Sequence, residues 1–328
     1  MKIRKLLAAI FGGAAVATTA VVVNNDHSTQ QRAEAAAATA NAAASCKKAS
    51  PFYWEIGDRD SPLASGSVGG ARYEAGTDMS IASSSKWVFG AYASQVRKNE
   101  FTSEDLAALT MRAGYTSLSV TACADYQPAS KSTQTVEQCF VAGQNDTVSA
   151  GDVGKFHYDG GHFQYAATEL FGLRGLTKGE LSERVSAVLG VPLTYSSPQI
   201  AGGIRTTPAT FGAFLRRILE GDLHMYSALG KHAICTNPSA CPDEATFTPV
   251  SRSERWHYSI GHWVEDDPEV GDGAFSSPGA MGFYPWIDAS RTWYGVLARE
   301  SYVAGAYDVS IDCGRTIRRA WLTAEPQG

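Results

Sequence analysis

A serine and a lysine three residues apart, Ser83 and Lys86, are the residues whose types and spacing most directly suggest chemistry. Positions i and i+3 of a helix share a face, so the lysine amine can reach the serine hydroxyl. A buried lysine amine loses proton affinity and can then accept the hydroxyl proton. Residues 87–93 are apolar, which predicts a buried helix with Ser83 in its first turn, where the helix dipole favours developing negative charge. The pair therefore predicts a nucleophile with its own base.

The same spacing also arises by chance, because Ser45 and Lys48 repeat it in a segment with the appearance of a tail. Taken alone, Ser83 is more simply interpreted as a serine that caps a helix. Whether it is a nucleophile therefore depends on the motifs further along the chain.

Two further clusters follow the pair. One surrounds Tyr158 in residues 156–163, and the other, residues 276–288, contains a glycine-rich turn that begins at Gly279. In order and spacing, the three clusters resemble the serine hydrolases of the class C β-lactamase and DD-peptidase superfamily, which includes esterases and amidases. The resemblance covers most of residues 52–325, and it includes a Gly-Gly turn at residues 202–203. Agreement of several motifs in order favours catalysis over the capping interpretation.

The resemblance implies a role for each motif. Ser83 matches the nucleophile, Lys86 matches the lysine beside it, and Tyr158 matches a tyrosine that helps to move the proton between nucleophile and leaving group. Gly279 and Ala280 match the glycine-rich entry to a strand. By that match, the backbone N–H groups of Ala280 and Ser83 form an oxyanion hole.

Two positions depart from the family pattern. Gly160 stands where the tyrosine motif has asparagine, and Ser277 stands where the third motif often has lysine or histidine. Loss of that cation removes a natural partner for a substrate carboxylate, which favours an esterase or amidase with a neutral substrate. Arg205 or Arg255 could supply the charge instead. Ser277 itself is either a residue that contacts substrate or a plain loop serine.

Two alternatives to the esterase or amidase therefore stay open. One is a β-lactamase or D-Ala-D-Ala carboxypeptidase of the cell envelope, and the other is a catalytically silent envelope-binding protein of the same fold. For each enzyme the expected partner is a small ester, amide or peptide. No cofactor or metal is expected, since the histidine and cysteine spacings are not those of metal sites.

The elements that must position these motifs follow from the residue pattern. Strand-like segments lie near both ends of the chain, and segments with helical spacing lie between them, which predicts one α+β domain whose ends share a sheet. The resemblance implies that this sheet is antiparallel, flanked by helices and interrupted by a mainly helical region. The predicted strands are residues 53–57, 65–69, 256–264, 282–287 and 293–298. The predicted helices begin near residues 83 and 102 and otherwise cover 163–173, 178–189, 207–220 and 309–322.

Residues 1–23 have a basic start and an apolar run of 18 residues, the pattern of an export signal, with an uncleaved membrane anchor as the alternative. The alanine-rich residues 24–45 have no apolar period and are interpreted as a tether. A single hydrolase domain is then expected over residues 46–328, in a secreted or periplasmic protein.

The composition sets wider limits. With 328 residues, 44% hydrophobic and 19% charged, the chain is of ordinary globular type. A net charge of -5 argues against a nucleic-acid partner. Six cysteines in an exported chain predict three disulfides out of 15 possible connectivities. We expect two local pairs, Cys123 with Cys139 and Cys235 with Cys241, and a third pair, Cys46 with Cys313, that joins the ends of the domain.

Overall fold

The computed structural model describes residues 27–251 and 253–328, so the predicted export signal lies outside the described residues. Within them, strands from both ends of the chain form one eight-stranded antiparallel sheet. Its order is β2 (Pro62–Val68), β1 (Phe52–Gly57), β13 (Tyr294–Ala298), β12 (Tyr284–Ile287), β11 (Ala274–Ser276), β10 (Trp263–Glu265), β9 (His257–Tyr258) and β7 (Ile234–Cys235). The predicted α+β class with a shared sheet is confirmed.

The centre of the sheet joins the two ends of the sequence. Strand β1 pairs with β13 in the register Tyr53 to Ala298, and all six residues of β1 are buried. Aromatic and β-branched residues favour such a strand, because they pack well on a pleated surface covered on both faces. Strands β9 to β12, which continue the same sheet and lie next to the motifs of the site, are therefore held in a rigid framework.

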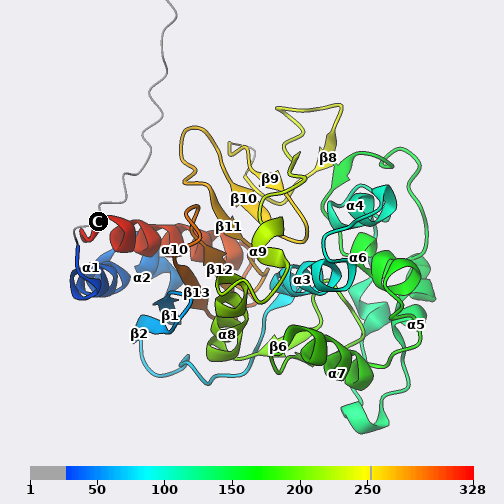
Figure 1. Ribbon diagram of the computed structural model, residues 1–328, viewed down its shortest axis with the longest axis horizontal. Coiled ribbons are helices and arrows are strands. Elements are labelled where there is room, and N and C mark those ends of the chain that lie inside the picture. Colours follow the sequence, from blue (N-terminus) through cyan, green and yellow to red (C-terminus); the bar gives the residue numbers. More distant parts are fainter. Residues whose placement is uncertain (1–26, 252) are drawn as a thin grey trace, which may run out of the picture.

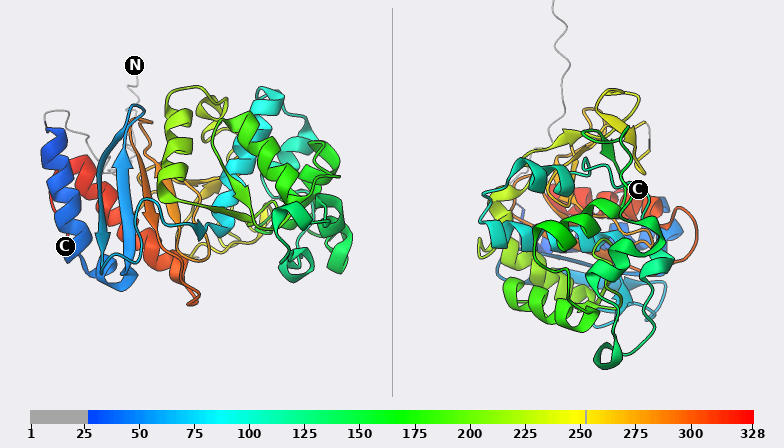
Figure 2. Two further views of the ribbon diagram at one scale, coloured as in Figure 1. Left: turned by 90° about the horizontal axis from the view of Figure 1, so that it is seen from below. Right: turned by 90° about the vertical axis from the view of Figure 1, so that its right-hand side faces the viewer.

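Helices cover both faces of the sheet (Figures 1 and 2). One face carries α1 (Thr29–Ala42), α2 (Ala44–Ala49) and α10 (Ala306–Thr323). The other carries α3 (Ser85–Arg97), α8 (Pro208–Leu219) and α9 (Met225–Ala228). Beyond α3 lies the predicted helical region, with α4 (Ser103–Leu109), α5 (Val136–Val141), α6 (Gly161–Tyr165) and α7 (Lys178–Leu189).

The interpretation of residues 24–45 as a tether is wrong where the structure describes them. Residues Thr29–Ala42 form helix α1, which packs on α10. Ala36 and Ala40 are one helical turn apart and fully buried, so alanine's small side chain lets the two helices approach closely. Arg32 is also buried, and it donates to two carbonyl groups in the last turns of α10 at 2.7 and 2.9 Å. A buried face made of alanines and one arginine does not give the periodic pattern of large apolar residues from which a helix is predicted.

The predicted strand over residues 256–264 is also wrong in detail, because it is two strands. Strands β9 and β10 run antiparallel and are joined by a tight turn that contains Gly261 with φ 72°. Only glycine adopts this backbone conformation at little cost, so Gly261 fixes the turn. The predicted helix at residues 163–173 begins earlier, as α6, and continues as a turn of π-helix over Ala166–Leu170.

Three disulfides are present with the expected pairing: Cys46–Cys313, Cys123–Cys139 and Cys235–Cys241. The first joins residues 267 positions apart, and in the chain-entropy model such a closure disfavours the unfolded state by about 5 kcal/mol. It ties α2 to α10, and thus one end of the described chain to the other. Among residues 27–251 and 253–328, no helix combines the length and the apolar character needed to span a bilayer.

Two buried histidines predict loss of stability in mild acid. Burial lowers the pKa of His162 from 6.5 to about 3 and that of His262 from 6.5 to about 4. Below pH 6.5 the unfolded chain therefore binds protons that the folded chain does not bind, so stability falls as pH falls. We expect a loss of about 2 kcal/mol per histidine between pH 6.5 and pH 5, measured by urea unfolding.

The matched variant is His262→Asn, which removes one of the two titrating groups. It is expected to reduce the loss between pH 6.5 and pH 5 to about half, whatever its stability at pH 6.5. Equal unfolding free energies of the wild-type protein at both pH values would contradict this account of the two histidines.

Candidate active site

The serine of the first motif lies at the N-terminal end of α3, on a short turn of 3₁₀-helix, Ala82–Ser84. Ala82 has a φ of 44°, a left-handed conformation that alanine rarely adopts and that concentrates at functional sites. The turn is held in place by β6 (Ile204–Thr206), because the Ile81 N–H donates to the Ile204 carbonyl at 3.2 Å. Ser83 thus precedes α3 rather than lying within it, and it still faces the helix N-terminus.

Lys86 lies in the first turn of α3, and its Nζ donates to the Ser83 Oγ at 2.9 Å. The same amine donates to the Ala201 carbonyl at 3.1 Å, and it lies 4.9 Å from the centre of the Tyr158 ring. Lys86 is 4% exposed, as its place on the apolar face of α3 predicts. Ala201 directly precedes the Gly-Gly turn at residues 202–203, so this fourth motif also contributes to the position of the amine.

The other two serines of the motif have structural contacts. The Ser84 Oγ donates to the Ser277 carbonyl at 2.6 Å, and the Ser85 Oγ accepts from the Ile204 N–H at 3.3 Å. Both residues are fully buried. Of the three serines, Ser83 is the one that lines the pocket described below.

Close backbone contact fixes α3 against the sheet. A Cβ atom on Gly90 would lie 2.5 Å from the Ile260 carbonyl oxygen, and one on Gly261 would lie 2.4 Å from the Lys86 carbonyl oxygen. His262 stacks on Trp87 of α3 with ring centres 5.6 Å apart. The turn between β9 and β10 therefore positions the helix that carries Lys86.

Tyr158 follows the short strand β4 (Phe156–His157) and lies beside Lys86. Its ring stacks on Trp263 of β10 at 5.2 Å and meets Tyr258 of β9 edge-on at 6.0 Å. Tyr158 lines the pocket together with Ser83, and its hydroxyl group has no hydrogen bond to another residue within 27–251 and 253–328. The structure thus brings the three predicted catalytic side chains together.

Gly160 departs from the family pattern for a steric reason. A Cβ atom at this position would lie 2.5 Å from Leu118 and 2.9 Å from Ala201. An asparagine side chain would therefore meet atoms that already fill its space. The neighbouring Asp159 holds the loop by accepting the N–H groups of Leu118 and Gly161 at 2.9 and 2.8 Å.

The third motif lies directly against the turn that carries Ser83. A Cβ atom on Gly279 would be 2.2 Å from the Ile81 carbonyl oxygen, so only glycine allows this contact. Ala280 lines the same pocket as Ser83, and its N–H has no hydrogen-bond acceptor in the described part of the chain. Ser277 is 3% exposed, and its hydroxyl donates to the Ser83 carbonyl at 3.2 Å. Ser277 therefore lies beneath the serine turn and supports it.

A small apolar pocket opens beside Ser83, with a volume of about 80 Å³. Its walls come from β10, the start of α10, the 3₁₀ turn that carries Ser83, and loop residues at 158, 249–250, 256, 278 and 280, and they carry no charged residue. The lining residues that the sequence did not assign to the site are Pro249, Val250, Trp256, Trp263, Pro278, Tyr307 and Ile311. Trp256 and Trp263 lie in the predicted strand over residues 256–264, whereas no pattern in the sequence pointed to Tyr307 or Ile311 as pocket residues.

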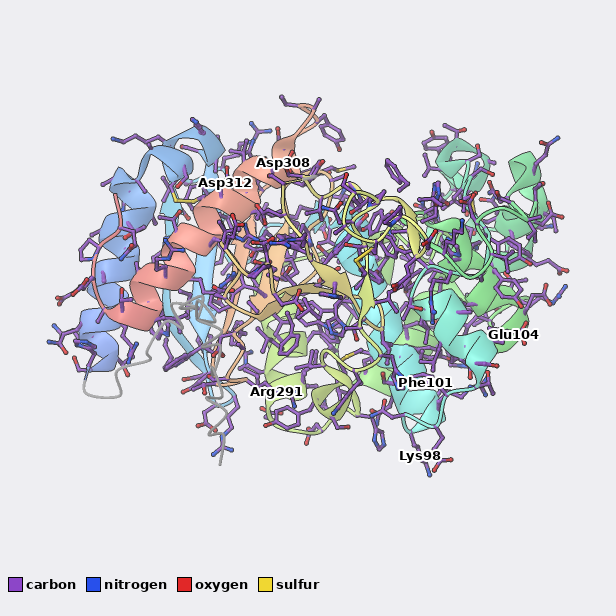
Figure 3. All side chains as sticks on the ribbon, turned by 90° about the horizontal axis from the view of Figure 1, so that it is seen from above. Lys98, Phe101, Glu104, Arg291, Asp308 and Asp312 are labelled. Atoms are coloured by element: carbon purple, nitrogen blue, oxygen red, sulfur yellow. A yellow bond between two sulfur atoms is a disulfide. The ribbon has the colours of Figure 1, made fainter. Side chains whose placement is uncertain are left out.

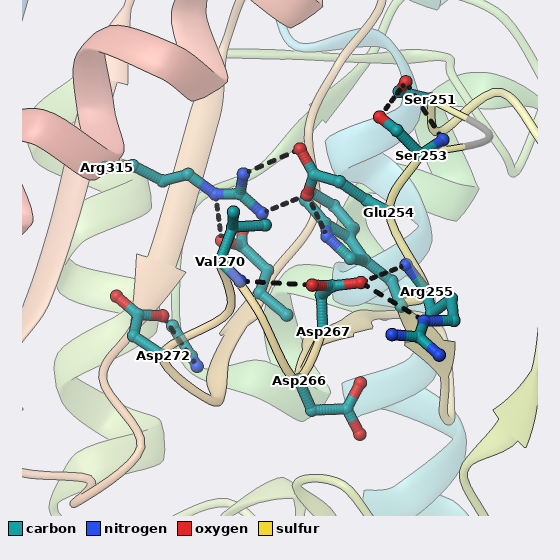
Figure 4. A network of polar contacts seen from close by, with 12 residues as sticks. Ser251, Ser253, Glu254, Arg255, Asp266, Asp267, Val270, Asp272 and Arg315 are labelled. Atoms are coloured by element: carbon teal, nitrogen blue, oxygen red, sulfur yellow. Dashed lines mark hydrogen bonds and ion pairs between the residues drawn. The ribbon is translucent and has the colours of Figure 1, made fainter. Parts of the chain in front are cut away.

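The two arginines that could have supplied a cation are paired elsewhere. The Arg205 Nε lies 2.9 Å from an Asp78 carboxylate oxygen, and Arg255 lies 3.8 Å from Glu269. Arg255 also lies 3.7 Å from Asp267 (Figure 4). Neither arginine lines the pocket.

A buried ionic network lies behind the pocket (Figure 4). Arg315 of α10 pairs with Glu254 at 2.8 Å and with Glu265 of β10 at 2.9 Å. Burial of Glu265 opposes its ionisation, yet Arg318 and Arg315 together lower the pKa of this carboxyl to about 2. The Trp256 Nε1 donates to Glu254 at 2.6 Å, so the network also fixes one wall of the pocket.

Solved structures with the same fold include several enzymes. Simvastatin synthase from Aspergillus terreus matches with a TM-score of 0.60 and 14% identity, over 91% of this chain and 98% of its own. A penicillin-binding protein from Bacillus halodurans gives 0.57 and 15%, over 80% and 94%. A D-stereospecific amidohydrolase from a Streptomyces species gives 0.55 and 14%, over 88% and 98%.

These matches confirm the predicted resemblance at the level of the fold, which this chain shares with β-lactamases, penicillin-binding proteins and related hydrolases. No model of a protein family matches the sequence, and no curated protein sequence matches it.

Proposed function

We propose that this chain, which has the fold of β-lactamases and penicillin-binding proteins, is a serine hydrolase that forms an acyl-enzyme on Ser83. The observation that carries the proposal is the 2.9 Å hydrogen bond between the Lys86 Nζ and the Ser83 Oγ in a buried site of this fold. A nucleophile and its base within hydrogen-bond distance are the geometric signature of covalent catalysis.

The reaction proceeds in two transfers. Lys86 takes the hydroxyl proton while the Ser83 Oγ bonds to the substrate carbonyl carbon. The resulting oxyanion is stabilised by the N–H groups of Ala280 and Ser83. The carbonyl then re-forms and expels the leaving group, which takes a proton from Tyr158 or Lys86. A water molecule attacks the acyl-enzyme in the same way and releases the acid and free Ser83.

The preferred substrate is a neutral ester or amide. No charged residue lines the pocket beside Ser83, and Arg205 and Arg255 are paired with carboxylates elsewhere. A substrate with a terminal carboxylate would thus lose its hydration without gaining a cation in exchange. This supports an esterase or amidase over a β-lactamase or carboxypeptidase, and we expect little turnover of a chromogenic cephalosporin. The three disulfides support a secreted or periplasmic location.

The test is labelling with a fluorophosphonate, followed by intact mass and peptide mapping of the folded protein. We expect one adduct, on Ser83, because a phosphonyl group traps an activated serine hydroxyl. Lys86→Ala should slow the labelling strongly. Absence of an adduct in protein with a native circular dichroism spectrum would favour the alternative, a catalytically silent envelope-binding protein.

Removal of the Tyr158 hydroxyl is expected to slow turnover while it leaves the site assembled. In Tyr158→Phe the ring can keep its stacking on Trp263, but the proton can no longer pass through the phenol. We expect kcat to fall by about 10²- to 10³-fold, the usual size of a general acid–base contribution. Steady-state kinetics with an aryl ester measures it, and the matched control is Tyr126→Phe, at a residue that is 94% exposed. Unchanged kcat would restrict Tyr158 to a packing role.

A further inference from the structure

The pocket beside Ser83 continues into a wider groove along the start of α10. Both cavities are lined by Pro249, Val250, Trp256, Tyr307 and Ile311, and the groove has a volume of about 530 Å³. Tyr307 and Ile311 are four residues apart on α10, so they present one face to the shared wall. The Ile311 side chain therefore lies where the small pocket meets the groove.

The two cavities differ in chemical character. The pocket carries no charged residue, whereas the groove is also lined by Glu254, Asp308 and Asp312. Figure 3 shows Asp308 and Asp312 on α10. Glu254 is paired with Arg315 at 2.8 Å, but burial and the neighbouring Asp312 raise the pKa of Asp308. An apolar group suits the pocket, and a carboxylate-terminated chain that reached through it would meet like charges.

The size of the pocket limits the group that it can hold. Its volume of about 80 Å³ is roughly half of that of an engineered cavity that binds benzene. A chain of about three or four carbons therefore fills it, and a longer chain must pass Ile311 to enter the groove. Ile311 is 8% exposed and lines both cavities together with the bulky Trp256 and Tyr307, so these side chains narrow the passage from the pocket into the groove.

Resting on the proposed function, we infer that this pocket selects the substrate by holding a short, uncharged apolar substituent of the ester or amide, and that Ile311 sets its length. This apolar substituent can be part of the acyl group or part of the leaving group. Two series of substrates distinguish the two cases. In one series the acyl chain varies and the aryl leaving group is fixed, and in the other the acyl group is acetyl and the alcohol varies.

We expect kcat/KM in one series to rise about fourfold for each added methylene up to about four carbons, and then to fall. Ile311→Ala should shift the maximum of that series to chains that are two or more carbons longer, because it joins the pocket to the groove. The matched control is Ile317→Ala, at a residue that is 3% exposed on the same helix but does not line either cavity. It loses a similar buried side chain and should keep the wild-type maximum.

Three outcomes are distinguishable. A shifted maximum in Ile311→Ala alone supports the inference, and the series in which it occurs identifies the group bound in the pocket. An unshifted maximum in both series, in folded Ile311→Ala that still labels on Ser83 with a fluorophosphonate, overturns the inference and leaves the proposed function in place. No Ser83 label in the wild-type protein overturns the proposed function itself.

Discussion

The Ser83→Ala variant is expected to lose ester and amide hydrolysis by about 10⁴-fold or more, since no acyl-enzyme can form without the hydroxyl. The change removes one oxygen atom from a residue that lies on the pocket surface. The fold should therefore persist, with a melting temperature close to that of the wild-type protein. Initial rates with an aryl ester, measured beside a thermal melt, test both statements.

The chain supplies its own control for this experiment. Ser45 and Lys48 repeat the same spacing, but Ser45 does not line the pocket, and its Oγ is 3.2 Å from the Thr316 hydroxyl. Ser45→Ala should therefore keep full activity. If Ser83→Ala kept more than a small fraction of the wild-type rate, a nucleophile other than Ser83 would be required.

The second large effect is expected for Lys86→Arg. Arginine keeps the positive charge and can still donate hydrogen bonds, but it does not lose a proton in proteins and so cannot act as a base. We expect the acylation rate to fall by about 10³-fold, near the middle of the range for loss of a general base. Single-turnover kinetics with an aryl ester, or the rate of fluorophosphonate labelling, measures this step directly.

Two comparisons make the Lys86 result interpretable. Lys48→Arg is the matched control and should have no effect on acylation. Lys86→Met removes both charge and base, so a variant that is slow with methionine but nearly normal with arginine would show that Lys86 acts through its charge alone. Equal losses in the arginine and methionine variants are the result expected of a base.

The sequence predicts the chemistry of the site better than its geometry. The spacing of Ser83 and Lys86 predicts that the two side chains meet, and they do, at 2.9 Å. It does not predict the 3₁₀ turn or the left-handed conformation of Ala82, because the local sequence has no glycine at that point. This backbone is imposed by contact with Gly279 and β6, both distant in sequence.

The residues that line the pocket could likewise be predicted only in part from the sequence. Trp256 and Trp263 lie in the predicted strand over residues 256–264, but in the sequence Tyr307 and Ile311 are ordinary residues near the start of the last helix. Their position beside Ser83 depends on how α10 crosses the sheet. That crossing results from packing on β12 and β13 and on helices α1 and α2 from the other end of the chain, which no local pattern in the sequence specifies.

Errors in the predicted fold have equally local causes. Helix α1 was missed because its buried face consists of alanines and Arg32, so neither apolar periodicity nor large side chains reveal it. The disulfide pairing was easier to predict, because the short separations of Cys123 from Cys139 and of Cys235 from Cys241 favour two local pairs and leave one pair for the ends of the domain. That remaining pair, Cys46 with Cys313, is present.

The disulfides make much of the chain a covalent ring with a smaller ring inside it. Tyr126 is 94% exposed in the loop between Cys123 and Cys139, which itself lies between Cys46 and Cys313. A protease that cuts the backbone beside Tyr126 opens the smaller ring alone, because the Cys123–Cys139 bond keeps the larger ring closed, and the two pieces stay joined by two S–S bonds. One piece carries Ser83 and the other carries the rest of the pocket, so a first cut at this loop separates neither from the other.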